Sequence, residues 1–170
     1  SVMADLLSRF PYTVLIATIS IIISVIIGIP LGVSCAVRAN TVFDRISMVL
    51  SLVFASIPGF WLALMLIQLF SVKLGILPAF GFDSWKCYVL PCTANAMAAV
   101  ATLARQTRAS MLEVIRADYV TTAKAKGIAN LRVLYHHALP NGLIPIITTV
   151  GTRFSALLGG TIVIETIYSI

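Results

Sequence analysis

Charged side chains are scarce in this chain, since Asp, Glu, Lys and Arg together make up 11% of its 170 residues. Soluble domains average about a quarter charged residues. Apolar residues reach 59%, and the mean hydropathy is +1.02. The low charge extends over the whole length, which indicates a membrane protein and excludes an ordinary soluble domain.

The motifs of common enzyme chemistries are also missing. The sequence has no GxxxxGK[ST] or GxGxxG loop for phosphates and no HExxH for zinc. Its two histidines, His136 and His137, are adjacent and would point about 100° apart on a helix, so they cannot chelate one metal together. The six acidic residues form no close pair for acid–base catalysis. We predict a chain that is not an enzyme and holds no metal or cofactor of its own.

Three cysteines are present, and they form no CxxC pair. Cys87 and Cys92 would lie near one face of the membrane, where a disulfide between them is one interpretation. A role as small apolar filler is favoured.

Long apolar runs are what the sequence does contain. We predict spans at about 12–37, 46–72, 87–108 and 139–158, each long enough for about 30 Å of hydrocarbon, and the start of a further element at 160–170. The fold class expected is an all-α membrane protein, a polytopic bundle forming one domain over 1–170. We also expect the chain to be truncated at both ends.

The second run is interrupted by Ser56–Phe60. Pro58 removes a backbone donor and Gly59 removes a side chain, so a kink or a helix break is expected there. Such a break either lines or flanks a substrate path or serves packing alone, and the sequence favours neither.

Two charges in or near the last apolar region, Arg153 and Glu165, are costly in hydrocarbon unless they face a cavity or a partner. They could pair across a subunit interface or touch a substrate. Alternatively, Arg153 extends toward the membrane edge and Glu165 lies in a re-entrant or interfacial turn, which the sequence favours.

Basic residues show the orientation of the chain. Eight lie at 38–45 and 105–137, and three lie on the opposite side: Arg9, Lys73 and Lys86. Positive residues concentrate in cytoplasmic loops, so 116–140 is predicted to be cytoplasmic and 73–88 is not. This distribution also explains the net charge of +6 without a nucleic-acid partner.

The 116–140 segment is the longest polar stretch. Tyr119–Gly127 reads as a short helix ended by glycine. One narrow helical face carries apolar residues interrupted by Lys124, a pattern that suggests a docking surface rather than a simple connector. Its members are Val120, Ala123, Gly127, Leu131 and Leu134.

This stretch resembles the EAA loop of the membrane-spanning subunits of binding-protein-dependent ABC importers. In that pattern Ala123, Gly127, Leu139 and Pro140 match, whereas Thr121, Thr122 and His137 do not. The departures are similar to the dipeptide, oligopeptide and nickel branch, through TRASMLEV at 107–114, DYV at 118–120 and HALPN at 137–141. Further similar segments are Ile27–Val33, Ser56–Leu66 and Leu77–Phe82.

The resemblance implies a permease of the type I importer kind in a bacterial or archaeal cytoplasmic (inner) membrane, moving a di- or oligopeptide or a nickel-type solute. It implies cytosolic ATPase subunits that bind and hydrolyse ATP, a second permease in a homo- or heterodimer, an extracytoplasmic binding protein, and surrounding lipid. An ATPase-independent channel or ion-coupled carrier is the alternative.

The resemblance also assigns roles within the loop. Val120, Ala123 and Gly127 would seat in an ATPase groove, Lys124 and Lys126 would contact its rim, and Pro140 would fix the start of the next span. The complete set of expected coupling residues is Tyr119, Val120, Ala123, Lys124, Lys126, Gly127, Leu139 and Pro140, and the possible pathway residues are Pro58, Gly59, Arg153 and Glu165.

Overall fold

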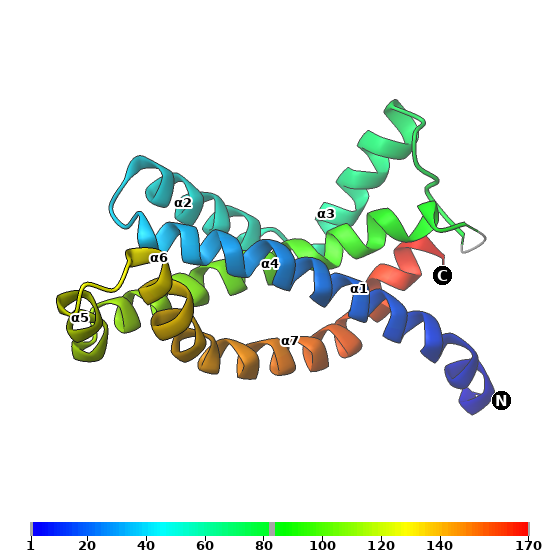
Figure 1. Cartoon of the computed structure of the whole chain (residues 1–170). Helices are drawn as coiled ribbons and strands as arrows, with labels where there is room; N and C mark the ends of the chain where they lie inside the picture. Colours follow the sequence, from blue (N-terminus) through cyan, green and yellow to red (C-terminus); the bar gives the residue numbers. More distant parts are fainter. Residues whose placement is uncertain (1, 82–83, 170) are drawn as a thin grey trace.

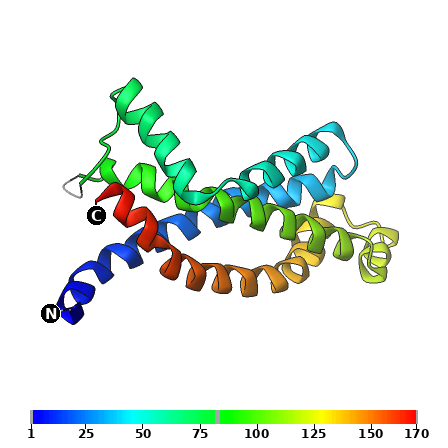
Figure 2. The same cartoon turned by 180° about the vertical axis from the view of Figure 1, so that it is seen from behind.

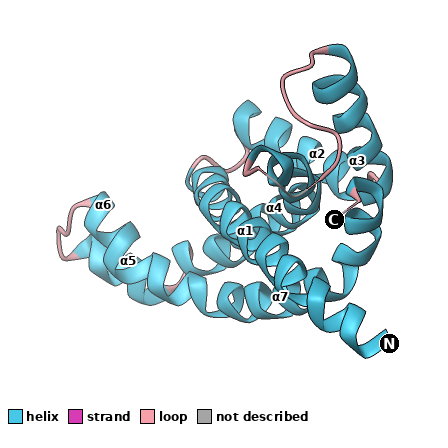
Figure 3. Cartoon of the chain, turned by 90° about the vertical axis from the view of Figure 1, so that its right-hand side faces the viewer, coloured by secondary structure: helices cyan, strands magenta, loops and turns pink. Residues whose placement is uncertain are grey.

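The computed structural model describes the backbone of residues 2–81 and 84–169, and the side chains from residue 10 onward apart from 160–162 within those ranges. Phe82 and the side chain of Arg9 therefore lie outside the described residues. The described chain is helical with no strand (Figure 3). This confirms the all-α expectation.

The elements follow the apolar runs. They are α1 (Val2–Val37), α2 (Val42–Ser56), α3 (Gly59–Leu66), the π-helix η1 (Ile67–Lys73), α4 (Lys86–Ile115), α5 (Asp118–Ala125), α6 (Asn130–Arg132), the π-helix η2 (Val133–Ala138) and α7 (Leu139–Tyr168). In the described part of the chain, three helical stretches are long and apolar enough to cross a membrane: 10–37, 86–115 and 130–159.

The second apolar run is divided more sharply than a kink would divide it. Val42–Ser56 and Gly59–Lys73 meet at 97°, so they form either one broken span or a re-entrant loop. Pro58 stands before the first turn of α3 with φ −61° and ψ 132°, where its missing N–H costs no helical hydrogen bond. The break ends α2, and α3 points away from the bundle (Figure 1).

Close contact between α1 and α4 forms the centre of the bundle. A Cβ added at Gly32 would lie 2.5 Å from the Ala104 carbonyl oxygen, so only glycine lets the backbones approach this far. Ser20 Oγ donates a hydrogen bond of 3.3 Å to the Cys92 carbonyl across the same interface.

The last helix lies along the edge of the bundle (Figure 2). It extends to Tyr168, so the separate element expected to start at 160–170 is wrong: residues 160–168 continue α7. The Tyr168 hydroxyl donates a hydrogen bond of 3.2 Å to the Ala63 carbonyl in α3. The α5–α6 region lies at one end of the molecule, and both termini lie toward the other (Figure 1).

Candidate functional site

The loop helix α5 has a well-defined end. The Gly127 N–H donates to the Lys124 carbonyl at 2.9 Å, and the Ile128 N–H donates to the Ala123 carbonyl at 3.4 Å. These two bonds form a Schellman motif, which requires the left-handed backbone that Gly127 adopts with φ +78°. A Cβ at Gly127 would meet nothing within 4 Å, so the glycine serves backbone conformation rather than close contact.

The apolar face of α5 points into the chain. Val120 and Ala123 are 1% and 7% exposed. They pack in a cluster with Met111 of α4 and with Val133 and Ala138 of η2. The expectation that Val120 and Ala123 seat directly in a partner groove is therefore wrong, because burying them here anchors α5 to the bundle.

The predicted face is also discontinuous. The turn at Gly127 ends α5, so Leu131 and Leu134 belong to α6 and η2 rather than to the same helix. Leu131 is 70% exposed, whereas Leu134 is half-buried. The surface that α5 presents to solvent is instead polar and aromatic, and its exposed members include Tyr119, Thr121, Thr122, Lys124 and Lys126.

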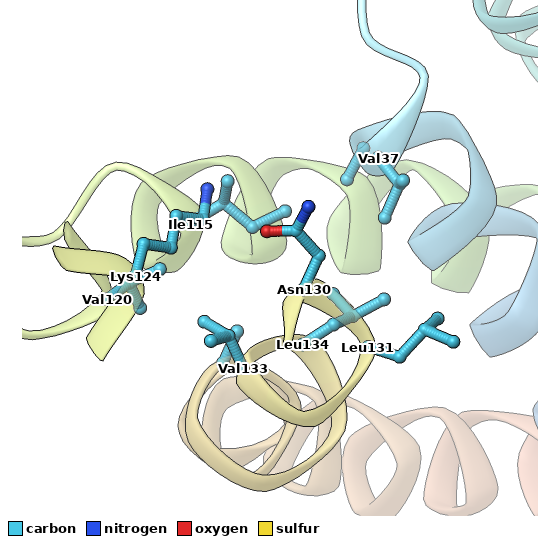
Figure 4. Close-up of a pocket in the computed structure, with 10 residues that line it drawn as sticks. Val37, Ile115, Val120, Lys124, Asn130, Leu131, Val133 and Leu134 are labelled. Atoms are coloured by element: carbon cyan, nitrogen blue, oxygen red, sulfur yellow. The ribbon is translucent and has the colours of Figure 1, made fainter. Parts of the chain in front are cut away.

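Beneath the loop lies a cavity of 290 Å³ between α5, α6 and the ends of α1 and α4. Figure 4 shows residues of its lining, in which Val120 and Val133 are apolar and Lys124 and Asn130 are polar. The exposed Leu131 and Val37 of α1 also line it.

Leu139 begins α7, and Pro140 stands in its first turn, as the sequence predicts. The helix is nevertheless continuous with α6 and η2, so one apolar helical stretch covers 130–159. Leu139 is half-buried against the Val120 cluster, and Pro140 is exposed. The six-residue π-helix just before Pro140 is a place where the ring of a proline can be accommodated, since π segments occur where a regular helix is disturbed.

Sequence reasoning missed an ion pair that fastens the α1–α2 turn to α4. Arg108 donates from Nε to Asp44 Oδ1 at 2.5 Å and from Nη2 to Asp44 Oδ2 at 2.6 Å. The Asp44 side chain is 2% exposed and also accepts the Asn40 N–H at 2.9 Å. The two residues are 64 positions apart, and no local pattern shows that such distant groups meet.

The break carries the first two pathway candidates, Pro58 and Gly59. Both are exposed. Pro58 borders a shallow and mainly apolar groove with Leu52, Phe60 and Trp61. Their contribution to a path stays a prediction.

Arg153 and Glu165 are both inside α7, and they do not pair with each other within ion-pair distance. Arg153 Nη2 donates to Thr102 Oγ1 of α4 at 3.1 Å, so the side chain crosses to the neighbouring helix instead of extending to the membrane edge. Glu165 is 7% exposed, and its Oε1 has no hydrogen-bond partner among the described residues. The interfacial turn expected at Glu165 is wrong, because the backbone there is helical.

The chain matches a known protein family over most of its length. Residues 28–170 match the family described as "Binding-protein-dependent transport system inner membrane component". The chain belongs to this family of ABC-importer permeases. Family membership confirms the expected permease class, the multi-pass architecture and the inner-membrane location.

Individual relatives agree with the assignment. The permease is 42% identical over 165 residues to the glutathione transport system permease protein GsiC of Escherichia coli strain K12, covering 97% of this chain and 54% of the relative. Its identity to GsiC of Salmonella choleraesuis is 40% over the same length and coverage. The chain thus spans about half the length of these relatives.

A solved structure supports the fold. The permease aligns with a TM-score of 0.73 to a chain of an amino acid ABC transporter crystallised with histidines, covering 97% of this chain and 74% of that one, at 17% identity. At this identity the likeness shows the fold alone.

The three cysteines of the permease, Cys35, Cys87 and Cys92, are buried and free. The disulfide considered for Cys87 and Cys92 is therefore absent, and the filler interpretation describes them better. Within the described residues, no group of three or more His, Cys, Asp or Glu side chains is placed to hold a metal ion.

Proposed function

We propose that this chain forms the substrate path of an ATP-driven importer and couples it to cytosolic ATPase subunits through α5. The observation that carries the proposal is the two-sided α5 helix. Its apolar side is anchored by Val120 and Ala123, and its opposite side is exposed at the end of the bundle. A connector would have no need of an anchored helix with a capped end.

The anchoring favours rigid transmission of force. Only Arg116 and Ala117 separate α4 from α5, and Val120 shares one buried cluster with Met111 of α4 and Val133 of η2. A displacement of α5 by a closing ATPase dimer would move α4 and α7 together and change access to the path. The exposed Tyr119 and Lys126 replace Val120 and Ala123 as the proposed ATPase contacts.

The remaining partners follow from the family. We propose a second permease subunit, identical or related, an extracytoplasmic binding protein that delivers substrate, and ATP hydrolysis in the separate ATPase subunit. The names of the relatives favour a peptide substrate over a nickel-type solute. Membership in a binding-protein-dependent family disfavours the ATPase-independent carrier.

The coupling proposal is tested by Tyr119→Ala/Lys126→Glu in the full-length importer. We expect copurified ATPase and peptide uptake to fall several-fold, while the amount of permease in the membrane stays unchanged. Trp85→Ala is the matched control, because Trp85 is 73% exposed at the other end of the bundle. Wild-type levels of copurified ATPase and uptake in the double variant would refute the role of α5.

The orientation of the chain in the membrane can be tested separately. We expect a membrane-impermeant thiol reagent to label Lys126→Cys from the cytoplasmic side and Ser84→Cys from the opposite side, because both side chains are exposed and the three native cysteines are buried. Labelling of both positions from one side would overturn the proposed orientation.

A further inference from the structure

A line of polar side chains runs along one face of α4. Asn95, Thr102, Gln106 and Glu113 fall within about 40° of one another at 100° per residue, and they extend over about 27 Å of helix. Asn95 and Thr102 are half-buried, and Gln106 and Glu113 are exposed. The Asn95 Nδ2 atom is buried without a hydrogen-bond partner among the described residues. Polar groups inside a membrane almost always face a protein interior or a water-filled cavity rather than lipid.

Arg153 of α7 joins this line within the helices that are long and apolar enough to cross a membrane. Its partner Thr102 is about 24 Å along α4 from Lys86 and about 20 Å from Ile115. The Thr102 hydroxyl donates to the Ala98 carbonyl at 2.9 Å and accepts from Arg153 at 3.1 Å, so both groups are oriented. The guanidinium is therefore held at a fixed place beside the polar face.

The charge of Arg153 is not neutralised within the described chain. The ion pair found among described residues joins Arg108 to Asp44, and the hydrogen bond found for Arg153 is the one to a neutral hydroxyl. A guanidinium has five donors and matches a carboxylate in a bidentate geometry. An unpaired cation within a membrane-spanning helix is costly, which is why such residues mark substrate or ion paths.

The helix that carries Arg153 is also the least covered of the long helices. Of the apolar stretch in 130–159, 11% is buried, against 56% in 86–115. Beside Arg153 in the chain, the exposed Thr152 lies about 100° around α7 from it, whereas the exposed Gly151 and Ser155 lie about 160° away. Much of the surface of α7 is therefore open to molecules outside this chain.

We propose that Arg153, held by Thr102, binds a carboxylate of the transported peptide, and that the polar line on α4 forms the adjoining wall of the path. This inference rests on the proposed importer function. A substrate carboxylate would compensate a charge that has no ionic partner among the described residues.

Charge substitution in the full-length importer, reconstituted with its ATPase and binding protein in liposomes, tests the site. The probe is glutathione, a peptide with two carboxylates. Arg153→Gln is expected to lower maximal uptake about tenfold or more, because a hydrogen bond to a charged group is lost. Arg153→Lys should fall between wild type and Arg153→Gln. Equal uptake by wild type and Arg153→Gln would overturn the proposal.

Chemical modification of a cysteine at position 153 tests whether the charge of the side chain, rather than its size, is required. Arg153→Cys is treated with a methanethiosulfonate that adds an aminoethyl group or with one that adds a sulfonatoethyl group, and wild type receives both reagents as the control. Uptake should rise with the cationic group and stay low with the anionic one. Equal recovery with both, or recovery with neither, would count against a bound carboxylate.

A matched pair tests the role of Thr102 as a positioning residue. Thr102→Val removes the acceptor of Arg153 and is expected to raise KM for glutathione-loaded binding protein or lower maximal uptake severalfold. Thr93→Val is the control, because Thr93 makes the same type of bond to its own helix and lies about 180° away on α4. Equal effects of the two variants would remove Thr102 from the site.

Three outcomes distinguish failure of the Arg153 site from failure of the proposed importer function. A parallel loss of the copurified second permease in Arg153→Gln would show an inter-subunit ion pair and overturn the proposal. Failure of the wild-type importer to transport glutathione or any other peptide would refute the proposed substrate class, and with it the carboxylate site. Normal wild-type transport with an unaffected Arg153→Gln variant would refute the site alone.

Discussion

The two helices that flank the loop helix, α4 and α7, have opposite surroundings. α4 lies at the centre of the bundle, where α1 approaches so closely that Gly32 has no room for a Cβ. α7 lies at the edge, and a Cβ at Gly151 would meet nothing within 4 Å. The difference indicates that α4 is stabilised by its own chain, whereas much of the surface of α7 is left to other molecules.

The largest effect is expected for Asp44→Ala, which leaves Arg108 without its partner at the edge of the α4 interface. Removing one member of a buried pair costs about 3–5 kcal/mol, and partial exposure of Arg108 places the loss near the lower limit. The heat-inactivation midpoint of the purified permease should fall. The double variant Asp44→Ala/Arg108→Met should be more stable than the single variant, and equal stability would contradict a coupled pair.

Gly32→Ala comes second. The added Cβ would lie 2.5 Å from a carbonyl oxygen and 2.6 Å from the Thr107 Cβ, and the backbone of α4 cannot move away without disturbing the bundle. Overpacking of this kind costs about 1–3 kcal/mol. The same midpoint should fall, and an unchanged midpoint would show that α1 and α4 pack less tightly than described.

Gly142→Ala tests whether α7 packs on α4 less rigidly than α1 does, because the added Cβ meets its neighbour at the same distance as in Gly32→Ala but the neighbour is a flexible side chain. Its Cβ would lie 2.5 Å from Met111 Sδ, the far part of a flexible side chain that can change rotamer. We expect a loss below about 1 kcal/mol. If the heat-inactivation midpoint of Gly142→Ala falls to that of Gly32→Ala or below it, the contact between α4 and α7 is as rigid as that between α1 and α4.

Gly151→Ala should have the smallest effect on the isolated subunit. The space around it is open, and alanine favours a helix interior over glycine by about 0.5–1 kcal/mol. The midpoint should be equal to or slightly above that of wild type. A clear loss of stability would indicate that this face of α7 is already packed within the chain.

The helix content and membrane class could be predicted because each depends on local composition. The uncharged runs identify the spans, and Pro58 with Gly59 identifies the break. The left-handed turn at Gly127 was also predictable, since a glycine after a short polar helix is a local signal. The identity of the family followed from residues in fixed register within 107–141.

The orientation of α5 could not be predicted in this way. A helical wheel shows that Val120 and Ala123 share a face, but not whether that face meets this chain or a partner. The pairs Asp44–Arg108 and Thr102–Arg153 depend on how distant helices pack, 64 and 51 positions apart. The start of α7 at Leu139 was predictable from Pro140, but the helical lead-in through α6 and η2 was not, because a proline was taken to mark a break.

The hydrogen bond from Tyr168 to the Ala63 carbonyl has a consequence for biosynthesis. Ala63 is fully buried, and the donor follows it by 105 residues. At a translation rate of about 5–20 residues per second, α3 is made about 5–20 s before the ribosome has added Tyr168. During that interval the half-span after the 97° break has α4 to rest on but not the end of α7. Nascent chains arrested before Tyr168 should therefore expose α3 to protease or to crosslinking by the insertion machinery, and release of the complete chain should protect it.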